Sequence, residues 1–570
     1  PVCLASPLRD VYKRQDKINA NTNGWYLPEV QRQYVWGNRN NSEDYVCLLL
    51  DSLLQGYPIG GIVVWENSAK VPFRLFLTDY ASNKFNKSVE EGRWGQSKSL
   101  VYDGQQRLQT LYSVLKYTFN DRVLHYDLFF DAKNSNADET GFLFRNKDAA
   151  PELRYLKLTE LCSISCSEES EAKYTIEDRL VPLYENDKEK RSIVPLYEND
   201  KEKRSIVRQN LNRLWDIFVK DNEKQIAYFP IKASSPDTAN EVFRRLNIGG
   251  VSLTSVELVL SKIKAKYYDF EEKLWELSNK IKKYDIEFSS EQLLQLLYLL
   301  IKGTIRVDDR YFKGTDEELD LFNSKLEDVE IPLLDFFNYL RSEFNINHNY
   351  IIPRWAAILP MIIYLIRRNE INHNYKWSDN YNDEHKKQMK AVHQYFLSSQ
   401  ILDWNTQTMV NEFSRLATES AINQREFPLS EIKAFAVSKN RVGELNENNF
   451  TWQPWFALKM LQPGRAFNFT ENKPHIDHIF PMNRGIDDEM YQNEVDVLWN
   501  FQILPAGVNL YKWNKSPKEF LLAHPELKEK FDFLPNLENE VWNNHIDFIQ
   551  YRKNLMIKYL KERYDISLNS

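Results

Sequence analysis

The most constraining feature of this 570-residue chain is a strand–strand–helix pattern in its last hundred residues. Two apolar runs, Ile476 to Phe480 and Val497 to Leu504, each end at a proline, which predicts two short strands. A helix is predicted to follow from near Gly507. It carries Asn509 and Lys512 on one face, because residues three apart are neighbours on a helix. Polar side chains from all three elements are therefore expected to converge on one cleft.

The polar residues of these elements match the needs of phosphodiester hydrolysis, which are an activated water, a cation and charge stabilisation. His478 as a neutral imidazole can accept a proton from water. Asp477 and the side-chain carbonyl of Asn509 are hard oxygen ligands suited to Mg²⁺ or Mn²⁺. Asn500 is expected to orient the imidazole through its second ring nitrogen. The pattern thus predicts catalytic roles for His478 and Asn500 and metal binding by Asp477 and Asn509.

Strand geometry leaves one question open at this cleft. A regular strand sends the adjacent Asp477 and His478 to opposite faces, so the backbone must twist out of the ideal pleat there. Alternatively, His475 and Asp477 form a pair on one face. Lys512 and Asn514 are accessory candidates on the helical segment.

The order of these residues resembles a known nuclease fold. Asp-His-Ile-x-Pro from Asp477, an asparagine at Asn500 and Asn-x-x-Lys from Asn509 resemble the ββα-metal fold of HNH nucleases, in the variant with asparagine at the third position. The motif Leu-Pro-x-x-x-Asn-x-x-Lys-x-Asn-Lys from Leu504 to Lys515 is similar to the C-terminal nuclease domain of the GmrSD type IV restriction endonucleases. The resemblance implies a metal-dependent nuclease acting on double-stranded DNA.

A second motif lies nearer the N-terminus, where the predicted strand Leu100–Tyr102 leads into Asp-Gly-Gln-Gln-Arg and a helix. Asp103 is expected at the helix N-cap and the next four residues in the first turn. The N–H groups and the helix dipole make such a turn a phosphate site, which Arg107 can clamp. Asp103 can equally hold Mg²⁺ beside the phosphates. From the residues alone, an ordinary capping role is as compatible as either.

This motif is accompanied by three others. Pro-x-x-Gln-Arg-x-Tyr-x-Trp from Pro28, Pro-Ile-Gly from Pro58 and the stretch Phe243–Thr254 together resemble the N-terminal domain of the same GmrSD family. The resemblance implies a fold similar to ParB and sulfiredoxin and binding and hydrolysis of a nucleoside triphosphate of unknown identity. It assigns nucleotide-binding roles to Arg32, Asp103, Gln105, Gln106, Arg107 and, more loosely, Asn247. Thr254 is also expected to cap the helix that follows it.

Length sets the domain organisation, because 570 residues are too many for one hydrophobic core. We predict an α+β, multidomain protein. The predicted parts are a non-native leader (1–15), a ParB-like nucleotide-binding domain (16–264), a helical middle region (265–440) and an HNH nuclease domain (441–570). The first domain contains an exact tandem duplication at 181–206, which we expect in a polar surface loop.

A net charge of −7 argues against a uniformly basic surface, so DNA contacts are expected at local patches. The candidates are Arg341, Arg367 and Arg368, and the C-terminal Arg552, Lys553, Lys558, Lys561 and Arg563. The C-terminal group is at least as compatible with the solvated face of an amphipathic helix. The near-repeat at Ile346–Tyr350 and Ile371–Tyr375 is typical of loops, with no site expected.

Four cysteines, Cys3, Cys47, Cys162 and Cys166, lack the spacing of a zinc site and are expected to be reduced thiols in the cytoplasm. The chain has no apolar run long enough to span a membrane. The sequence leaves open whether the protein is a monomer or a homo-oligomer.

Together with the resemblance, these features predict a Mg²⁺-dependent DNA endonuclease of anti-phage type, acting on modified phage DNA and gated by a nucleoside triphosphate. The alternative is a non-cutting, nucleotide-switched DNA-binding regulator like a ParB clamp. A nuclease of structured RNA shares the same chemistry. His478 favours a nuclease, because a clamp has no use for a general base beside oxygen ligands.

Overall fold

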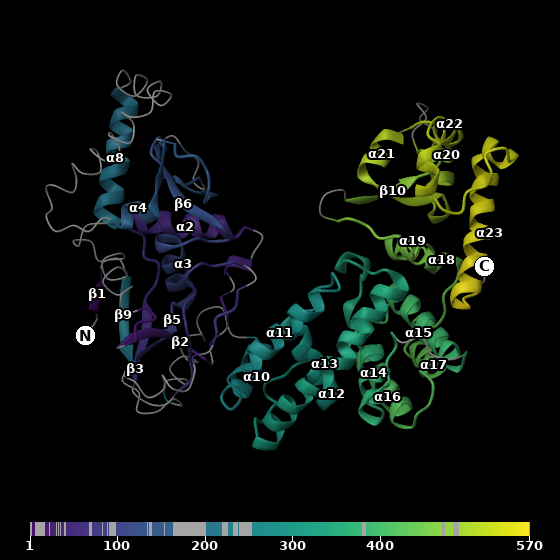
Figure 1. The fold of residues 1–570 in the computed structure, drawn as a ribbon, viewed down its shortest axis with the longest axis horizontal. Helices are drawn as coiled ribbons and strands as arrows, with labels where there is room; N and C mark the ends of the chain where they lie inside the picture. Colours follow the sequence, from purple (N-terminus) through teal and green to yellow (C-terminus); the bar gives the residue numbers. More distant parts are fainter. Residues whose placement is uncertain are drawn as a thin grey trace. The chain divides into compact units, whose positions relative to one another are not determined.

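The computed structural model describes residues 3–5, 18–21, 23–29, 31, 33–34, 36–38, 41–67, 71–81, 84–87, 89, 98–133, 135, 139–152, 154–163, 201–218, 226–231, 238, 254–378, 383–469, 473–482, 489–512 and 514–568. The chain forms two compact units, unit 1 (Pro1–Glu272) and unit 2 (Lys273–Ser570). Both contain helices, and the strands fall into one large and two small sheets (Figure 1).

Unit 1 is built on a six-stranded mixed sheet in the order β1–β9–β3–β5–β2–β4. Its strands are β1 (Cys3–Ala5), β2 (Gly24–Pro28), β3 (Ile62–Asn67), β4 (Phe73–Arg74), β5 (Lys98–Asp103) and β9 (Ile226–Ile231). β5 pairs in parallel with β2 and antiparallel with β3. Leu100 and Val101 are therefore fully buried. The sheet thus fixes the position of Asp103, the last residue of β5.

Helices and a second sheet complete unit 1. The helices are α2 (Ser42–Leu54), α3 (Gln105–Lys116), α4 (Leu158–Ser163), α8 (Lys201–Phe218) and α10 (Ser255–Lys264), and the three-stranded antiparallel sheet contains β7 (Phe142–Asn146), β6 (Arg122–Asp127) and β8 (Tyr155–Lys157). Apolar residues of α2 and α3 share one core with residues of both sheets. The predicted N-cap is confirmed, because the Thr254 side chain accepts from Glu257 N–H in a capping box.

Two segments of unit 1 differ from simple expectations. β1 lies within residues 1–15, the predicted non-native leader, and it pairs antiparallel with β9. Within the tandem duplication, residues 201–206 belong to α8 rather than to a loop. The rest of the duplication lies outside the described residues. The origin of residues 1–15 stays a prediction.

Unit 2 begins with the predicted helical region, and the helical prediction is confirmed. Its elements are α11 (Phe270–Lys282, which starts in unit 1), α12 (Ser290–Lys302), α13 (Asp316–Phe344), η4 (Asn349–Ile351), η5 (Trp355–Ile358), α14 (Leu359–Ile371), α15 (Asp383–Ile401), α16 (Gln407–Ile422) and α17 (Leu429–Ser438). Most of α14 is buried. No helix among the described residues is long and apolar enough to cross a membrane.

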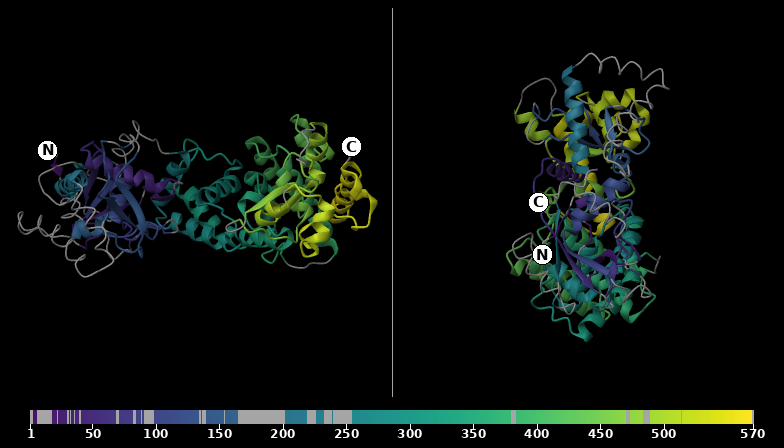
Figure 2. Two further views of the ribbon diagram at one scale, coloured as in Figure 1. Left: turned by 90° about the horizontal axis from the view of Figure 1, so that it is seen from above. Right: turned by 90° about the vertical axis from the view of Figure 1, so that its left-hand side faces the viewer.

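The C-terminal part of unit 2 contains the predicted strand–strand–helix stretch. Its elements are α18 (Glu447–Phe450), α19 (Pro454–Leu461), β10 (Pro474–His478), α20 (Glu489–Val495), η6 (Leu498–Asn500), β11 (Phe501–Pro505), α21 (Ala506–Lys512), α22 (Pro517–Ala523), η7 (Pro525–Lys530), η8 (Glu540–Asn543) and α23 (His545–Tyr564). α19 contacts both α15 and β11. The green and yellow elements accordingly lie together in two further views (Figure 2). The middle helices and the C-terminal elements thus share one compact unit.

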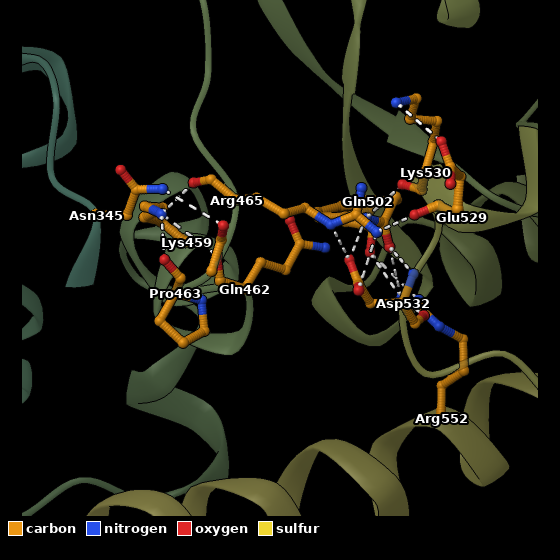
Figure 3. A network of polar contacts seen from close by, with 12 residues as sticks. Asn345, Lys459, Gln462, Pro463, Arg465, Gln502, Glu529, Lys530, Asp532 and Arg552 are labelled. Carbon is orange, nitrogen blue, oxygen red and sulfur yellow. Dashed lines mark hydrogen bonds and ion pairs between the residues drawn. The ribbon is translucent and has the colours of Figure 1, made fainter. Parts of the chain in front are cut away.

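A buried polar network supports the back of β11 (Figure 3). Arg552 of α23 is fully buried and donates to the carbonyl oxygens of Trp499, Phe501 and Asp532. Gln502 donates to the Asp532 carboxylate at 3.1 Å. Because Arg552 is buried, its predicted place in a basic surface patch is wrong.

The other cations of the predicted patches have partners within the protein. The pairs are Lys553–Glu447, Lys558–Glu562, Lys561–Asp565, Arg563–Glu343, Arg341–Asp285 and Arg367–Glu370, and Arg368 lies over the ring of Tyr375. Lys558 keeps 70% of its side chain exposed. This exposure agrees with the solvated helix face, and the role of these cations as DNA contacts stays a prediction.

We expect Arg552→Met to destabilise the C-terminal part of unit 2 by about 3 kcal/mol or more. The change removes the donor from one buried and two part-buried carbonyl oxygens, and each such loss costs about 1–3 kcal/mol. Amide hydrogen exchange in the full chain, followed at β11 and α23, measures the loss as faster exchange. Lys558→Met on the same helix is the control, with an expected effect within about 0.5 kcal/mol. Equal exchange in the two variants would contradict the structural role of Arg552.

Candidate functional site

The candidate site of unit 2 is built by β10, β11 and α21. β10 pairs antiparallel with β11, placing Asp477 opposite Gln502 and His478 opposite Phe501. α21 contacts both strands. The predicted order of two strands and a helix is therefore present. Asn500 lies in the 3₁₀ turn before β11 rather than on the strand.

Asp477 and Lys512 form a buried ion pair at the junction of strand and helix. Lys512 Nζ lies 2.8 Å from Asp477 Oδ2 and donates to the backbone carbonyl of His478 at 2.7 Å. Burial raises the pKa of Asp477 and lowers the pKa of Lys512, and the attraction between the two charges opposes both shifts. Asn509, three residues before Lys512, shares its helix face and is half-buried.

His478 is paired with the carboxylate of Asp496, which belongs to none of the sequence motifs. Its Nε2 lies 2.9 Å from Oδ1 of Asp496, which follows α20. The Phe501 ring meets the imidazole edge to face, with 4.8 Å between ring centroids. A neutral imidazole that donates Nε2–H to Asp496 carries its acceptor lone pair on Nδ1. This arrangement can present Nδ1 as a general base.

The pairing of β10 with β11 runs through Asp477 and His478 without a register shift. The adjacent side chains reach different partners, Lys512 of α21 for Asp477 and Asp496 for His478. Within β10 the pairing is therefore regular, and the twist out of the ideal pleat stays a prediction. His475 is exposed, and its role as a metal ligand stays a prediction, as does the accessory role of the exposed Asn514.

Asn500 makes contacts that differ from the expected one. It is fully buried, and its Oδ1 accepts from Phe480 N–H at 3.0 Å. Its Nδ2 donates to the carbonyls of Phe480 and Val495 at 2.9 and 2.8 Å. The expected bond to the imidazole is wrong, because both ends of the amide hold the backbone after β10. Asn500 thereby positions the segments that carry His478 and Asp496.

The donor set bears on metal binding. Asp477 and Asn509 supply hard oxygens from two packed elements, which suits Mg²⁺. Among the described residues, no group of three or more His, Cys, Asp or Glu side chains is placed to hold a metal ion.

Cys162, one of the two described buried thiols, has its pKa raised to about 12 by burial. Thiolate chemistry at that position is therefore disfavoured.

The N-terminal motif lies where β5 turns into α3. Gly104, with φ of 80°, is the helix N-cap, and Asp103 ends β5. The predicted N-cap role of Asp103 is therefore wrong, because a left-handed glycine occupies that position. Asp103 keeps 45% of its side chain exposed and lies 3.6 Å from Arg107.

Arg107 braces the preceding loop. Its guanidinium donates to the carbonyl oxygens of Ile59 and Gly61. Gly60 lies between them with φ of 85°, and a Cβ added there would overlap the guanidinium. Burial lowers the pKa of Arg107, and Asp103 opposes this shift. The Pro-Ile-Gly motif thus makes room for Arg107.

The two glutamines of the motif donate to a buried and a half-buried partner. Gln105 donates to Gln31 Oε1 at 3.0 Å, and Gln106 donates to the Gln33 carbonyl at 3.1 Å. Gln31 in turn donates to the Tyr102 carbonyl. These contacts join the Gln-Arg segment to the Asp-Gly-Gln-Gln-Arg turn. Two further candidates, Arg32 and Asn247, lie outside the described residues.

Comparison with known proteins supplies one match. Residues 14–264 match a family described as GmrSD restriction endonuclease, N-terminal domain. The match includes the turn from Asp103 to Arg107 and ends before the site on β10. No curated protein matches the chain.

We expect Asn500→Ala to destabilise the β10–β11 hairpin by several kcal/mol. The substitution removes three buried hydrogen bonds, to Phe480 N–H and to the carbonyls of Phe480 and Val495, at about 1–3 kcal/mol each. Thermal unfolding of the full chain measures the effect. Asn493→Ala, at an exposed position of α20, is the matched control. A wild-type unfolding midpoint in Asn500→Ala would refute the role assigned to this amide.

Proposed function

Because residues 14–264 match the N-terminal domain of the GmrSD restriction endonucleases, we propose that this chain is an anti-phage restriction endonuclease that hydrolyses DNA at the site on β10. One observation carries the assignment of the site. His478 is held by Asp496 beside the buried pair of Asp477 and Lys512, which combines a base with a compensated carboxylate. A protein that only gripped DNA would not need a base held in this way.

The side chains divide the work as follows. Nδ1 of His478 removes a proton from the attacking water, and Asp496 stabilises the imidazolium that forms. Lys512 holds Asp477 and the His478 carbonyl in place. Asn500 holds the backbone after β10 through Phe480. The site is thus an HNH-type arrangement in which Asn500 acts through the backbone.

Asp477 and Asn509 are the residues that we propose to hold Mg²⁺. The bound ion would polarise a phosphoryl oxygen and stabilise charge on the leaving oxygen. Lys512 lies 2.8 Å from Oδ2 of Asp477. In this proposal the Asp477 carboxylate would therefore interact with both the Lys512 ammonium and a metal ion.

The substrate in this proposal is double-stranded DNA, with modified phage DNA as the target. Contacts to phosphate carry no direct sequence information, so restraint must come from elsewhere in the chain. We propose that a nucleoside triphosphate bound at the Asp103–Arg107 turn provides it. The proposal is supported by Gly104, the N-cap of α3, which has no side chain to cap the N–H groups of the first turn.

We expect His478→Ala to lower the rate of DNA cleavage by about two to four orders of magnitude, the usual loss for a general base. Asp496→Asn should lower it less, because the imidazole remains present and loses only its charged partner. Cleavage of modified and plain DNA with Mg²⁺, and its loss in EDTA, measures both effects.

Two controls make the cleavage test decisive. His373→Ala removes an exposed histidine of the middle region and should cleave at the wild-type rate. DNA binding by His478→Ala should persist. Full cleavage by His478→Ala would disprove the base, and full cleavage in EDTA would disprove the metal.

We expect Asp103→Ala to weaken triphosphate binding more clearly than it affects folding, because Asp103 is half exposed and ends its strand. Calorimetry with each triphosphate in turn measures the affinity. Asp121→Ala, which removes another exposed carboxylate of unit 1, is the control.

The same variants test the gating of cleavage. Arg107→Ala should change cleavage by about five- to a hundredfold, the scale of typical coupling between sites. Its folding must be checked, since Arg107 also holds the Ile59–Gly61 loop. Unchanged triphosphate affinity in Asp103→Ala, with cleavage independent of triphosphate in Arg107→Ala, would show that this turn does not gate the nuclease.

A further inference from the structure

A cavity of about 630 Å³ opens beside the first half of β10. Its lining residues are His348, Tyr350, Trp455, Phe469, Lys473, Pro474, His475 and Ile476. The volume lies within the range of cavities that bind small organic ligands. The lining comes from the η4 segment, from α19 and from the strand itself, so three parts of unit 2 form one concave surface.

Aromatic rings dominate the wall of this cavity. Tyr350 meets Trp455 edge to face, with 5.5 Å between ring centroids. Phe469 stacks on His348 at 4.4 Å with an interplanar angle of 15°. Tyr350 keeps 59% of its surface exposed, and Trp455 and Phe469 are half-buried. These rings therefore present surface to the cavity rather than filling the core.

The two copies of the near-repeat, Ile346–Tyr350 and Ile371–Tyr375, show that this residue pattern does not by itself expose its tyrosine. In the first copy, His348, Asn349 and Tyr350 are all exposed. In the second copy, the corresponding Tyr375 is buried and lies beneath the Arg368 guanidinium. The same residue pattern thus buries its tyrosine in one place and presents it to a cavity in the other.

The charge of the lining favours an anionic ligand. Lys473 and two histidines are among the eight lining residues, which include no carboxylate. The adjoining cavity, of about 620 Å³, shares His348 and Phe469 and contains Asp285 and Glu287. Those carboxylates lie 3.0 Å from Arg341 and 3.7 Å from Lys282. The aromatic cavity is therefore the one suited to a polyanion.

The cavity and the nuclease site share one strand. Ile476 lines the cavity, and His478 follows two residues later on the same face of β10. At about 3.3 Å per residue, the two positions lie roughly 7 Å apart along the strand. A DNA strand held at His478 would therefore bring neighbouring nucleotides to the mouth of the cavity.

We propose that this cavity binds an unstacked base of the DNA strand that is cut at the Asp477–His478 site. The base stacks on the rings of Tyr350, Trp455 and Phe469, and Lys473 neutralises the adjoining phosphate. Stacking on aromatic side chains holds bases without requiring sequence-specific hydrogen bonds. The inference rests on the proposed DNA cleavage and adds a base-binding subsite to it.

The test uses a DNA duplex with one bulged nucleotide, compared with the same duplex whose bulge lacks its base. Binding is measured for the full chain carrying His478→Ala, so that the DNA is not cut. We expect the bulge with a base to bind about 5- to 100-fold more tightly, the range for one base stacked on an aromatic side chain. A fluorescent 2-aminopurine in the bulge should be quenched on binding.

Pocket variants in the same background show whether the cavity makes the difference. Tyr350→Ala and Trp455→Ala should bring the ratio of the two affinities close to one. Trp452→Ala is the control, because Trp452 is 49% exposed and does not line the cavity. Thermal unfolding of each variant checks its folding, and Tyr350 is exposed enough to be replaced without loss of core packing.

The outcomes separate this inference from the proposed function. Equal binding of both duplexes, or a ratio unchanged in Tyr350→Ala and Trp455→Ala, would overturn the base-binding cavity and leave DNA cleavage standing. A folded protein that binds neither duplex and cuts no DNA would overturn both. A ratio lost in the two pocket variants and kept in Trp452→Ala would support the inference.

Discussion

The C-terminal part of unit 2 depends on the hydrogen bonds that the buried guanidinium of Arg552 donates. It links α23 to the carbonyls of Trp499 and Phe501, on either side of Asn500. A guanidinium can satisfy several carbonyls at once because it has five N–H donors in one plane. Burial lowers the pKa of Arg552 to about 9, with Asp532 opposing the shift. The same contacts fix β11, and β11 in turn fixes the register of Asp477 and His478.

This rigid support has a chemical consequence for the ion pair in front of it. Asp477 is buried, and a buried carboxylate is costly unless a cation compensates it. Lys512 provides that cation at 2.8 Å and is itself fully buried. A metal ion on the same carboxylate would weaken the hold of Lys512, because two cations repel. Lys512 also donates to the His478 carbonyl, so the ion pair holds the strand beside His478 as well as the carboxylate.

Sequence patterns predicted the parts of this fold that depend on local periodicity. Examples are β10, α21 and the cap at Thr254, where neighbouring residues decide the conformation. They failed where a distant partner decides. Arg552 reads as a surface residue on an amphipathic helix, yet it is buried by η6 and β11. Asp496 belongs to no motif, and it meets His478 where Asn500 bonds to Phe480 and Val495 on the neighbouring segments. Even the cap before α3 depended on Gly104 adopting a left-handed conformation, which placed Asp103 outside the helix.

The N-terminal turn shows how a residue can serve packing and still meet a ligand. Arg107 uses its guanidinium to hold Ile59 and Gly61, which explains why Gly60 must lack a side chain. Two carbonyl contacts leave further N–H donors of the five for an anion. Asp103 lies 3.6 Å away, however, and would repel a phosphate brought to that guanidinium. A triphosphate would bind here most readily with a divalent cation between Asp103 and its phosphates. If this turn does bind triphosphate, its affinity should therefore depend on Mg²⁺, and that dependence should disappear when Asp103 is removed.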